Sequence, residues 1–115
     1  MLRTNLTHVL SEQEHAKLLQ ENENVMICCG RMGPMCIPVY ESMEELEGEY
    51  KNIKFADMEF DTPDAKVIRN LPECRSFQGL PFVVYYKNGK VVKATSSIQS
   101  KEQITEILDE HFGNN

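Results

Sequence analysis

The sequence lacks any long apolar run. No window approaches the length of a membrane span, and the opening MLRTNLTHVL holds no apolar stretch long enough for a signal peptide. Basic residues are scarce and scattered: 12 Lys and Arg stand against 18 Asp and Glu, for a formal charge of −6. Nucleic acids and anionic membranes bind to basic faces, so we expect neither as a partner. From the lack of a signal peptide or membrane span we expect a cytoplasmic protein.

The chain also lacks repeats, low-complexity segments and linkers. Its 115 residues suffice for one domain with one core. A hydrophobic content of 41% and a charged content of 26% are typical of a globular protein. We therefore expect a single domain over residues 1–115.

Local patterns predict the order βαβαβαββα. Ser11 and Ser100 each begin a capping box, and Asn88-Gly89 between two β-rich runs predicts a type I′ hairpin. Pro38 should kink the helix that follows Gly33-Pro34, or delay its start. The expected strands are LTHV, 25–29, 52–60 and the two arms of the hairpin; the expected helices run from 11 to about 20, from 34 to 50, from 63 to 69 and from 100 to about 112.

Alternating β and α units followed by a hairpin predict an α/β fold. The central sheet should be mixed, with about five strands and about four helices on its two faces. Sites in such sheets gather beyond the carboxyl ends of strands. The strand 25–29 ends within ICCGRMGPMCIPV, residues 27–39, which holds three of the four cysteines. We expect the functional site there.

None of the cysteines forms a Cys-x-x-Cys pair. In a cytoplasmic chain, cysteines are more often reduced, catalytic or metal-binding than part of a disulfide framework. Cys36 is the best reactive thiol, because it opens a helix whose N-terminus stabilises a thiolate and because Arg31 is close in sequence. Cys29 is its candidate redox partner and Cys74 a minor one, provided that the Cα atoms approach within ~7 Å. A buried cysteine otherwise serves as a small apolar side chain.

Several features, in the right order, resemble the thioredoxin family. A buried strand runs into Gly33-Pro34, Gly79-Leu80-Pro81 precedes a strand, the hairpin reads YKNGK, and Ser100 opens a final helix. The resemblance covers nearly the whole chain and implies a thioredoxin fold. It also implies a cis peptide bond before Pro81, and it implies that Cys36 lies at the exposed rim of the family's site. In the family this proline faces the redox dithiol, and the main chain beside it holds a bound peptide.

The resemblance breaks at the active-site motif. The family has Trp-Cys-Gly-Pro-Cys, and alignment on Gly33-Pro34 places Met32 and Met35 at the two cysteines. A thioether forms no disulfide, so these positions are excluded from thiol–disulfide exchange. In a second register, Cys36-Ile-Pro-Val39 resembles a single-cysteine motif, but the first register fits the spacing better.

Two buried charges of the family also change. The resemblance places Met26 at the family's buried acid and Asp57 at its buried lysine. Asp57 is therefore a candidate proton acceptor beneath the site.

Two functions remain open. The first is a thioredoxin-like thiol–disulfide oxidoreductase of cell redox homeostasis, acting on protein disulfides through Cys36 with Cys29 or Cys74; a thioredoxin reductase is a candidate partner. The second is a redox-inactive module that binds proteins or peptides. The residues expected to contact a peptide are Arg31, Met32, Gly33, Pro34, Met35, Leu80 and Pro81.

Copper binding is a third reading of the same segment. Met32, Met35, Cys36 and Cys29 are soft ligands of the kind that select Cu(I). No Cys-x-x-Cys pair and no nearby histidine completes the set, so we expect neither a metal nor another cofactor.

Overall fold

The computed structural model describes residues 2–113 and contains a five-stranded mixed sheet in the order β1–β3–β2–β4–β5. β1, β3 and β2 are parallel, whereas β4 and β5 are antiparallel to their neighbours. The strands are β1 (Thr7–Val9), β2 (Asn24–Gly30), β3 (Lys54–Glu59), β4 (Phe82–Lys87) and β5 (Lys90–Ser96). The prediction of an α/β fold with a mixed sheet is confirmed.

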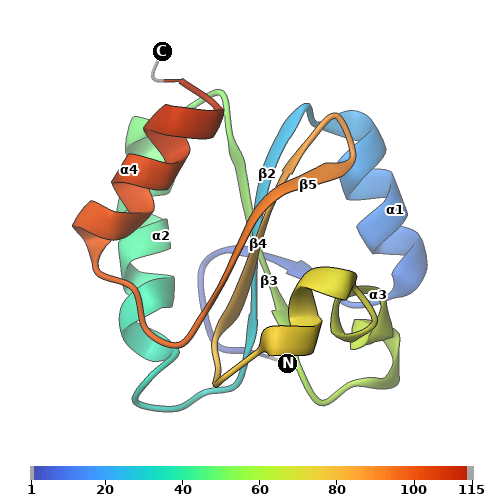
Figure 1. The fold of residues 1–115 in the computed structure, drawn as a ribbon. Helices are drawn as coiled ribbons and strands as arrows, with labels where there is room; N and C mark the ends of the chain where they lie inside the picture. The colour runs from blue at the N-terminus through green and yellow to red at the C-terminus, as the bar shows by residue number, and fades with distance from the viewer. Residues whose placement is uncertain (1, 114–115) are drawn as a thin grey trace.

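Four α-helices cover the two faces of the sheet. α2 and α4 lie on one face, and α1 and α3 lie on the other (Figure 1). The helices are α1 (Glu12–Glu21), α2 (Ile37–Glu49), α3 (Lys66–Arg69) and α4 (Lys101–His111); two short 3-10 helices, η1 (Pro63–Ala65) and η2 (Pro72–Ser76), flank α3. The segment predicted as loop between residues 70 and 81 thus contains η2.

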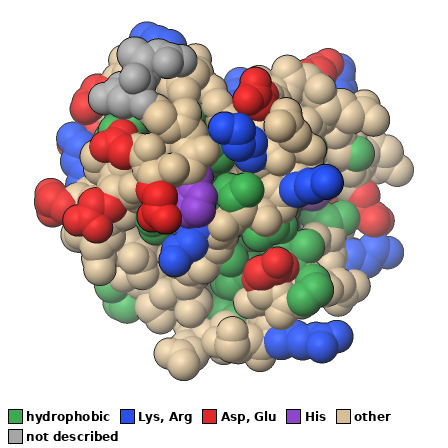
Figure 2. Space-filling model, turned by 45° about the horizontal axis from the view of Figure 1, so that its top comes forward, with side chains coloured by type: hydrophobic (Ala, Val, Ile, Leu, Met, Phe, Trp, Pro, Cys, Tyr) green, Lys and Arg blue, Asp and Glu red, His purple; other side chains and the backbone are tan. Residues whose placement is uncertain are grey.

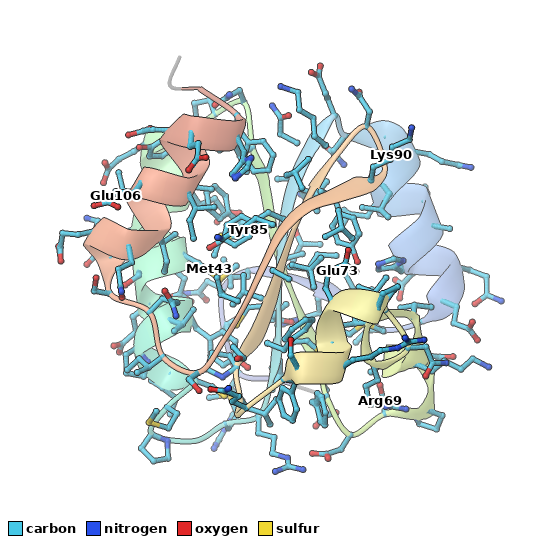
Figure 3. The ribbon with its side chains drawn as sticks, viewed as in Figure 1. Met43, Arg69, Glu73, Tyr85, Lys90 and Glu106 are labelled. Carbon is cyan, nitrogen blue, oxygen red and sulfur yellow. The ribbon has the colours of Figure 1, made fainter. Side chains whose placement is uncertain are left out.

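The core is divided in two by the sheet. All seven residues of β2 are buried, and because successive strand side chains point to opposite faces, they feed two separate apolar clusters. Met43 and Tyr85 lie between the sheet and helices α2 and α4 (Figure 3). Burial of each large apolar side chain contributes roughly 1.5–3 kcal/mol, so both layers hold the sheet in place.

The predicted caps and hairpin form with one difference. Ser100 and Gln103 make a complete capping box at α4. At α1, Ser11 Oγ accepts from the Glu14 N–H, but Glu14 Oε1 accepts from the N–H of Leu10 instead of that of Ser11. Asn88 and Gly89 have φ of 54° and 79°, as a type I′ turn requires.

Charges of both signs are interspersed on the surface. The face drawn in Figure 2 shows acidic and basic side chains side by side, with apolar side chains grouped between them. Among residues 2–113, none of the helices has the length and apolar character needed to cross a bilayer.

Candidate functional site

Helix α2 begins at Ile37, later than Pro34. The carbonyl of Gly33 accepts hydrogen bonds from the N–H groups of Cys36 (3.1 Å) and Ile37 (3.0 Å), which closes the turn before the helix. Cys36 is the N-cap residue, and Pro38 lies in the first helical turn, where a proline costs no hydrogen bond. Of the two expectations for Pro38, the delayed start is the one observed.

The helix start places Cys36-Ile37-Pro38-Val39, and not Met32–Met35, at the beginning of α2. Arg31 to Met35 form the loop between β2 and the helix, and the choice between the two registers stays a prediction. We call this segment the 31–35 loop. Val39, three residues after Cys36, is fully buried. The stretch thus offers one cysteine at the helix start and no second thiol one turn later.

Cys36 is buried, with 3% of its surface exposed, which corrects its expected place at an exposed rim. The 31–35 loop folds back over it, and the Arg31 N–H contacts Cys36 Sγ at 3.5 Å. A Cβ built on Gly30 would lie 2.8 Å from Cys36 Sγ and 3.4 Å from Pro81 Cβ. Cys36 and Pro81 therefore border the same point at the end of β2. The Leu80–Pro81 peptide bond is cis.

An apolar groove of about 460 Å³ opens beside Cys36. Five of the seven residues predicted to contact a peptide line it with their neighbours, and a sixth, Pro81, is buried. The lining residues are Arg31, Gly33, Pro34, Met35, Cys36, Phe60, Phe77, Gly79 and Leu80. We call this cavity the apolar groove.

Phe60 and Phe77 form a wall of the apolar groove that the sequence did not reveal. Their rings stack at 5.6 Å between centroids, with an interplanar angle of 17°. Phe60 follows β3 directly, and Phe77 follows η2. The available signal was the position of Phe60 at the carboxyl end of a strand next to β2.

Met32 does not line the apolar groove, and its contact with a peptide stays a prediction. Its sulfur accepts the N–H of Arg3 at 3.4 Å, and its side chain packs against the cluster below α2. It borders a different depression, which is also lined by Thr4 of the N-terminal segment and Glu44 of α2. The first residues of the chain therefore hold one side of the 31–35 loop.

Arg31 holds the other side of the loop. Its guanidinium donates two hydrogen bonds to the Asp61 carboxylate, at 2.7 and 2.8 Å, and lies 5.8 Å from the centre of the Phe60 ring. These hydrogen bonds lower the pKa of Asp61. The main-chain carbonyl of Arg31 accepts a hydrogen bond from the Tyr40 hydroxyl at 3.1 Å. The first two residues of the 31–35 loop are thus each held by contacts from distant parts of the chain.

The remaining cysteines divide between the two faces of the sheet. Cys28 shares the α2 and α4 cluster with Cys36, whereas Cys29 lies in the opposite cluster, against which Cys74 packs. All four cysteines are free thiols. Cys29 and Cys74 thus belong to the cluster on the other face of the sheet from that of Cys36, and their partnership with Cys36 stays a prediction.

Burial makes the other three thiols poor nucleophiles. It raises the pKa of Cys29 to about 12, raises that of Cys28 strongly, and also raises that of Cys74. Because the thiolate is the reactive form, these side chains act chiefly as small apolar groups.

Asp57 is a buried carboxylate, with 1% of its surface exposed. It accepts hydrogen bonds from Thr4 Oγ1 and binds His8 Nδ1 at 2.8 Å. Burial raises its pKa, although both partners oppose the shift. In the parallel strands Asp57 is paired with His8 on one side and Cys28 on the other, so the three side chains share a face. The buried acidic residue of this region is therefore Asp57, on β3.

Within residues 2–113, no group of three or more His, Cys, Asp or Glu side chains has an arrangement that would hold an ion.

Comparison with known proteins identifies the fold. No family sequence model matches the chain, and no curated protein is significantly similar to it in sequence. Among solved structures, thioredoxin f2 of Chlamydomonas reinhardtii superposes with a TM-score of 0.79 at 12% identity, over 96% of this chain and all of that one.

Two further thioredoxins show the same similarity. Thioredoxin of Plasmodium falciparum gives 0.76 at 19% identity, over 92% of this chain and 99% of that one. Mitochondrial thioredoxin 3 of Saccharomyces cerevisiae gives 0.74 at 18% identity, over 91% and 94%. The chain has the thioredoxin fold.

Proposed function

We propose that this thioredoxin-fold protein binds an extended peptide segment in the apolar groove and exchanges disulfides with it through a single thiol, that of Cys36. The observation that carries the proposal is the position of Cys36. It caps α2, lies beside Pro81 and contributes to the lining of the groove. A substrate sulfur seated in the groove would therefore meet this thiol at the N-terminus of α2.

The reaction proceeds in two exchanges. The Cys36 thiolate attacks one sulfur of a peptide disulfide, a Cys36–peptide mixed disulfide forms, and the second peptide sulfur leaves as a thiolate. Val39 stands where a second cysteine would release the peptide. An external low-molecular-weight thiol must therefore attack the peptide sulfur, which returns Cys36 as a thiolate and leaves the peptide as a new mixed disulfide. The implied partners are proteins with accessible disulfides and a thiol reductant.

A second candidate function is peptide binding without covalent chemistry. The burial of Cys36 favours it, because a substrate sulfur must displace part of the 31–35 loop before attack. Met35, which is exposed, and Leu80 adapt well to apolar partners. In this reading the apolar groove is retained and the thiol is a packing residue.

A labelled peptide separates the two functions. The probe is a fluorescein peptide whose cysteine lies between leucine and valine and is activated as a mixed disulfide with thionitrobenzoate. We expect release of thionitrobenzoate and a peptide adduct at Cys36, located by peptide mapping. Cys36→Ser should abolish the adduct, whereas the matched variant Cys74→Ser should retain it.

The same peptide with serine in place of cysteine measures non-covalent binding. Binding of the serine peptide without any adduct would leave the second function and exclude the first. If neither an adduct nor binding is seen, both functions are wrong.

A further inference from the structure

The methionines of this protein differ sharply in exposure. Met26, Met43 and Met58 are almost completely buried in the core. Met32 is half-buried, and its sulfur accepts an N–H from Arg3. Met35 has 46% of its surface exposed. Among residues 2–113, the thioether of Met35 is therefore the one most open to a reagent in solution.

Met35 also forms part of the wall of the apolar groove. It lines the apolar groove together with Pro34, Phe77 and Leu80, all apolar side chains. Within the described part of the chain, no hydrogen bond to Met35 is formed. A polar atom introduced on this side chain would have no partner in the groove once a peptide covers it, and burial of such an atom is costly.

We propose that Met35 is a reversible oxidation site that closes the apolar groove to peptides. A peroxide transfers one oxygen atom to the Met35 thioether: hydrogen peroxide is reduced to water, and the sulfur is oxidised by two electrons to the sulfoxide. The product is polar and chiral, and methionine sulfoxide reductases convert it back to the thioether. The inference rests on the proposed function, since it concerns peptide binding at the same groove.

The exposure pattern sets the order of reaction. Met35 reacts first, Met32 later because the N-terminal segment covers it, and the three core methionines last. Loss of an apolar contact and gain of an unpaired oxygen should weaken peptide binding by about three- to tenfold. The redox sensitivity of the site thus extends from the thiol of Cys36 to a thioether at the lip of the groove.

The test uses the full chain and the serine peptide described above, so it does not depend on Cys36 chemistry. The protein is treated with hydrogen peroxide, freed of it with catalase, and incubated with dithiothreitol, which reduces sulfenic acids and disulfides but not methionine sulfoxide. Peptide mapping then identifies the sulfoxides, and fluorescence anisotropy measures binding. We expect sulfoxide at Met35 first, together with the three- to tenfold loss of affinity, and full recovery after treatment with the two methionine sulfoxide reductases.

Three variants sharpen the result. Met35→Leu keeps an apolar side chain in the groove, and its affinity for the peptide, whatever its starting value, should no longer change after peroxide. Met35→Gln should bind weakly without any oxidant. Met32→Leu is the matched control and should stay sensitive.

The switch is wrong if Met32 is oxidised before Met35, if Met35 sulfoxide leaves the affinity unchanged, or if Met35→Leu still loses binding after peroxide. Failure of the untreated protein to bind the serine peptide is a different result: it overturns the proposed groove and the switch together.

Discussion

Gly30 and Cys36 are packed so closely that no side chain fits between them. A Cβ on Gly30 would lie 2.8 Å from Cys36 Sγ and equally close to the Tyr40 hydroxyl. Real Cβ atoms do not approach other atoms so closely, so at least one of these side chains would have to move. Gly30 thus keeps Cys36 beside Pro81 at the end of β2.

Gly30→Ala should displace the Cys36 thiol. Overpacking of a filled site costs about 1–3 kcal/mol, so we expect a loss of that size in the free energy of unfolding, measured in urea. Labelling of Cys36 by iodoacetamide, followed by peptide mapping, should change at the same time, because the sulfur loses its place under the loop. A variant as stable as the parent would show that the site relaxes freely.

Gly48→Ala is the matched control for that substitution. Gly48 lies on the exposed side of α2, and a Cβ there meets nothing within 4 Å. Since glycine within a helix is less stable than alanine by about 0.5–1 kcal/mol, this variant should be more stable than the parent. Its Cys36 labelling should not change.

Asp61→Asn should make Cys36 more accessible. The carboxylate holds Arg31 through two hydrogen bonds, and the main chain of Arg31 lies directly on the Cys36 sulfur. Removing the charge loosens the 31–35 loop, and we expect Cys36 labelling to be faster by about two- to fivefold, the range of an exposed ion pair.

Two controls accompany the Asp61 variant. High salt should accelerate labelling of the parent but not of Asp61→Asn, because the interaction is electrostatic. Asp64 lies in η1, and the salt bridge of Arg31 is to Asp61 instead. In Asp64→Asn, Cys36 should therefore be labelled at the rate of the parent. Equal rates for all three proteins would show that the pair does not hold the loop.

Cys29→Ala should leave the chemistry of Cys36 unchanged. Cys29 lies across the sheet from Cys36 and is fully buried. The substitution removes one buried sulfur, so stability should fall by about 1–2 kcal/mol through the small cavity. The yield of the Cys36–peptide adduct should nevertheless stay the same. A lost or trapped adduct would restore Cys29 as the resolving thiol.

Local sequence determines much of this fold. The hairpin at Asn88-Gly89 and the capping box at Ser100 depend on neighbouring residues alone, and both form as predicted. The α/β alternation likewise follows from apolar patterns within single elements. These signals need no knowledge of residues far away in the chain.

The interior of the site depends on distant contacts, and there the sequence was misleading. Cys36 is covered because Arg31 binds Asp61 and Met32 binds Arg3, each about thirty residues away. No local pattern encodes those pairs. Cys28 and Cys29, adjacent in a strand, point to opposite faces of the sheet, but which face α2 covers becomes visible only in the three-dimensional arrangement.

His15 should make the protein less stable in mild acid. Its ring is buried against Tyr86, with Nε2 3.2 Å from the Tyr86 hydroxyl, and burial lowers its pKa below the ordinary 6.5. The unfolded chain then binds a proton at a pH where the folded chain does not. This part of the stability is therefore present above about pH 6.5 and is lost as the pH falls toward the lowered pKa.

Urea unfolding at about pH 7.5 and about pH 5.5 measures the effect. Because other groups also titrate, the informative quantity is the difference between the parent and His15→Gln, which cannot be protonated. The variant should lose less stability than the parent between the two pH values. Tyr86→Phe, the matched control, removes the hydrogen bond at a cost of about 0.5–1.5 kcal/mol at both pH values and should keep the pH dependence of the parent. An identical acid loss in His15→Gln and the parent would mean that the buried imidazole is not its source.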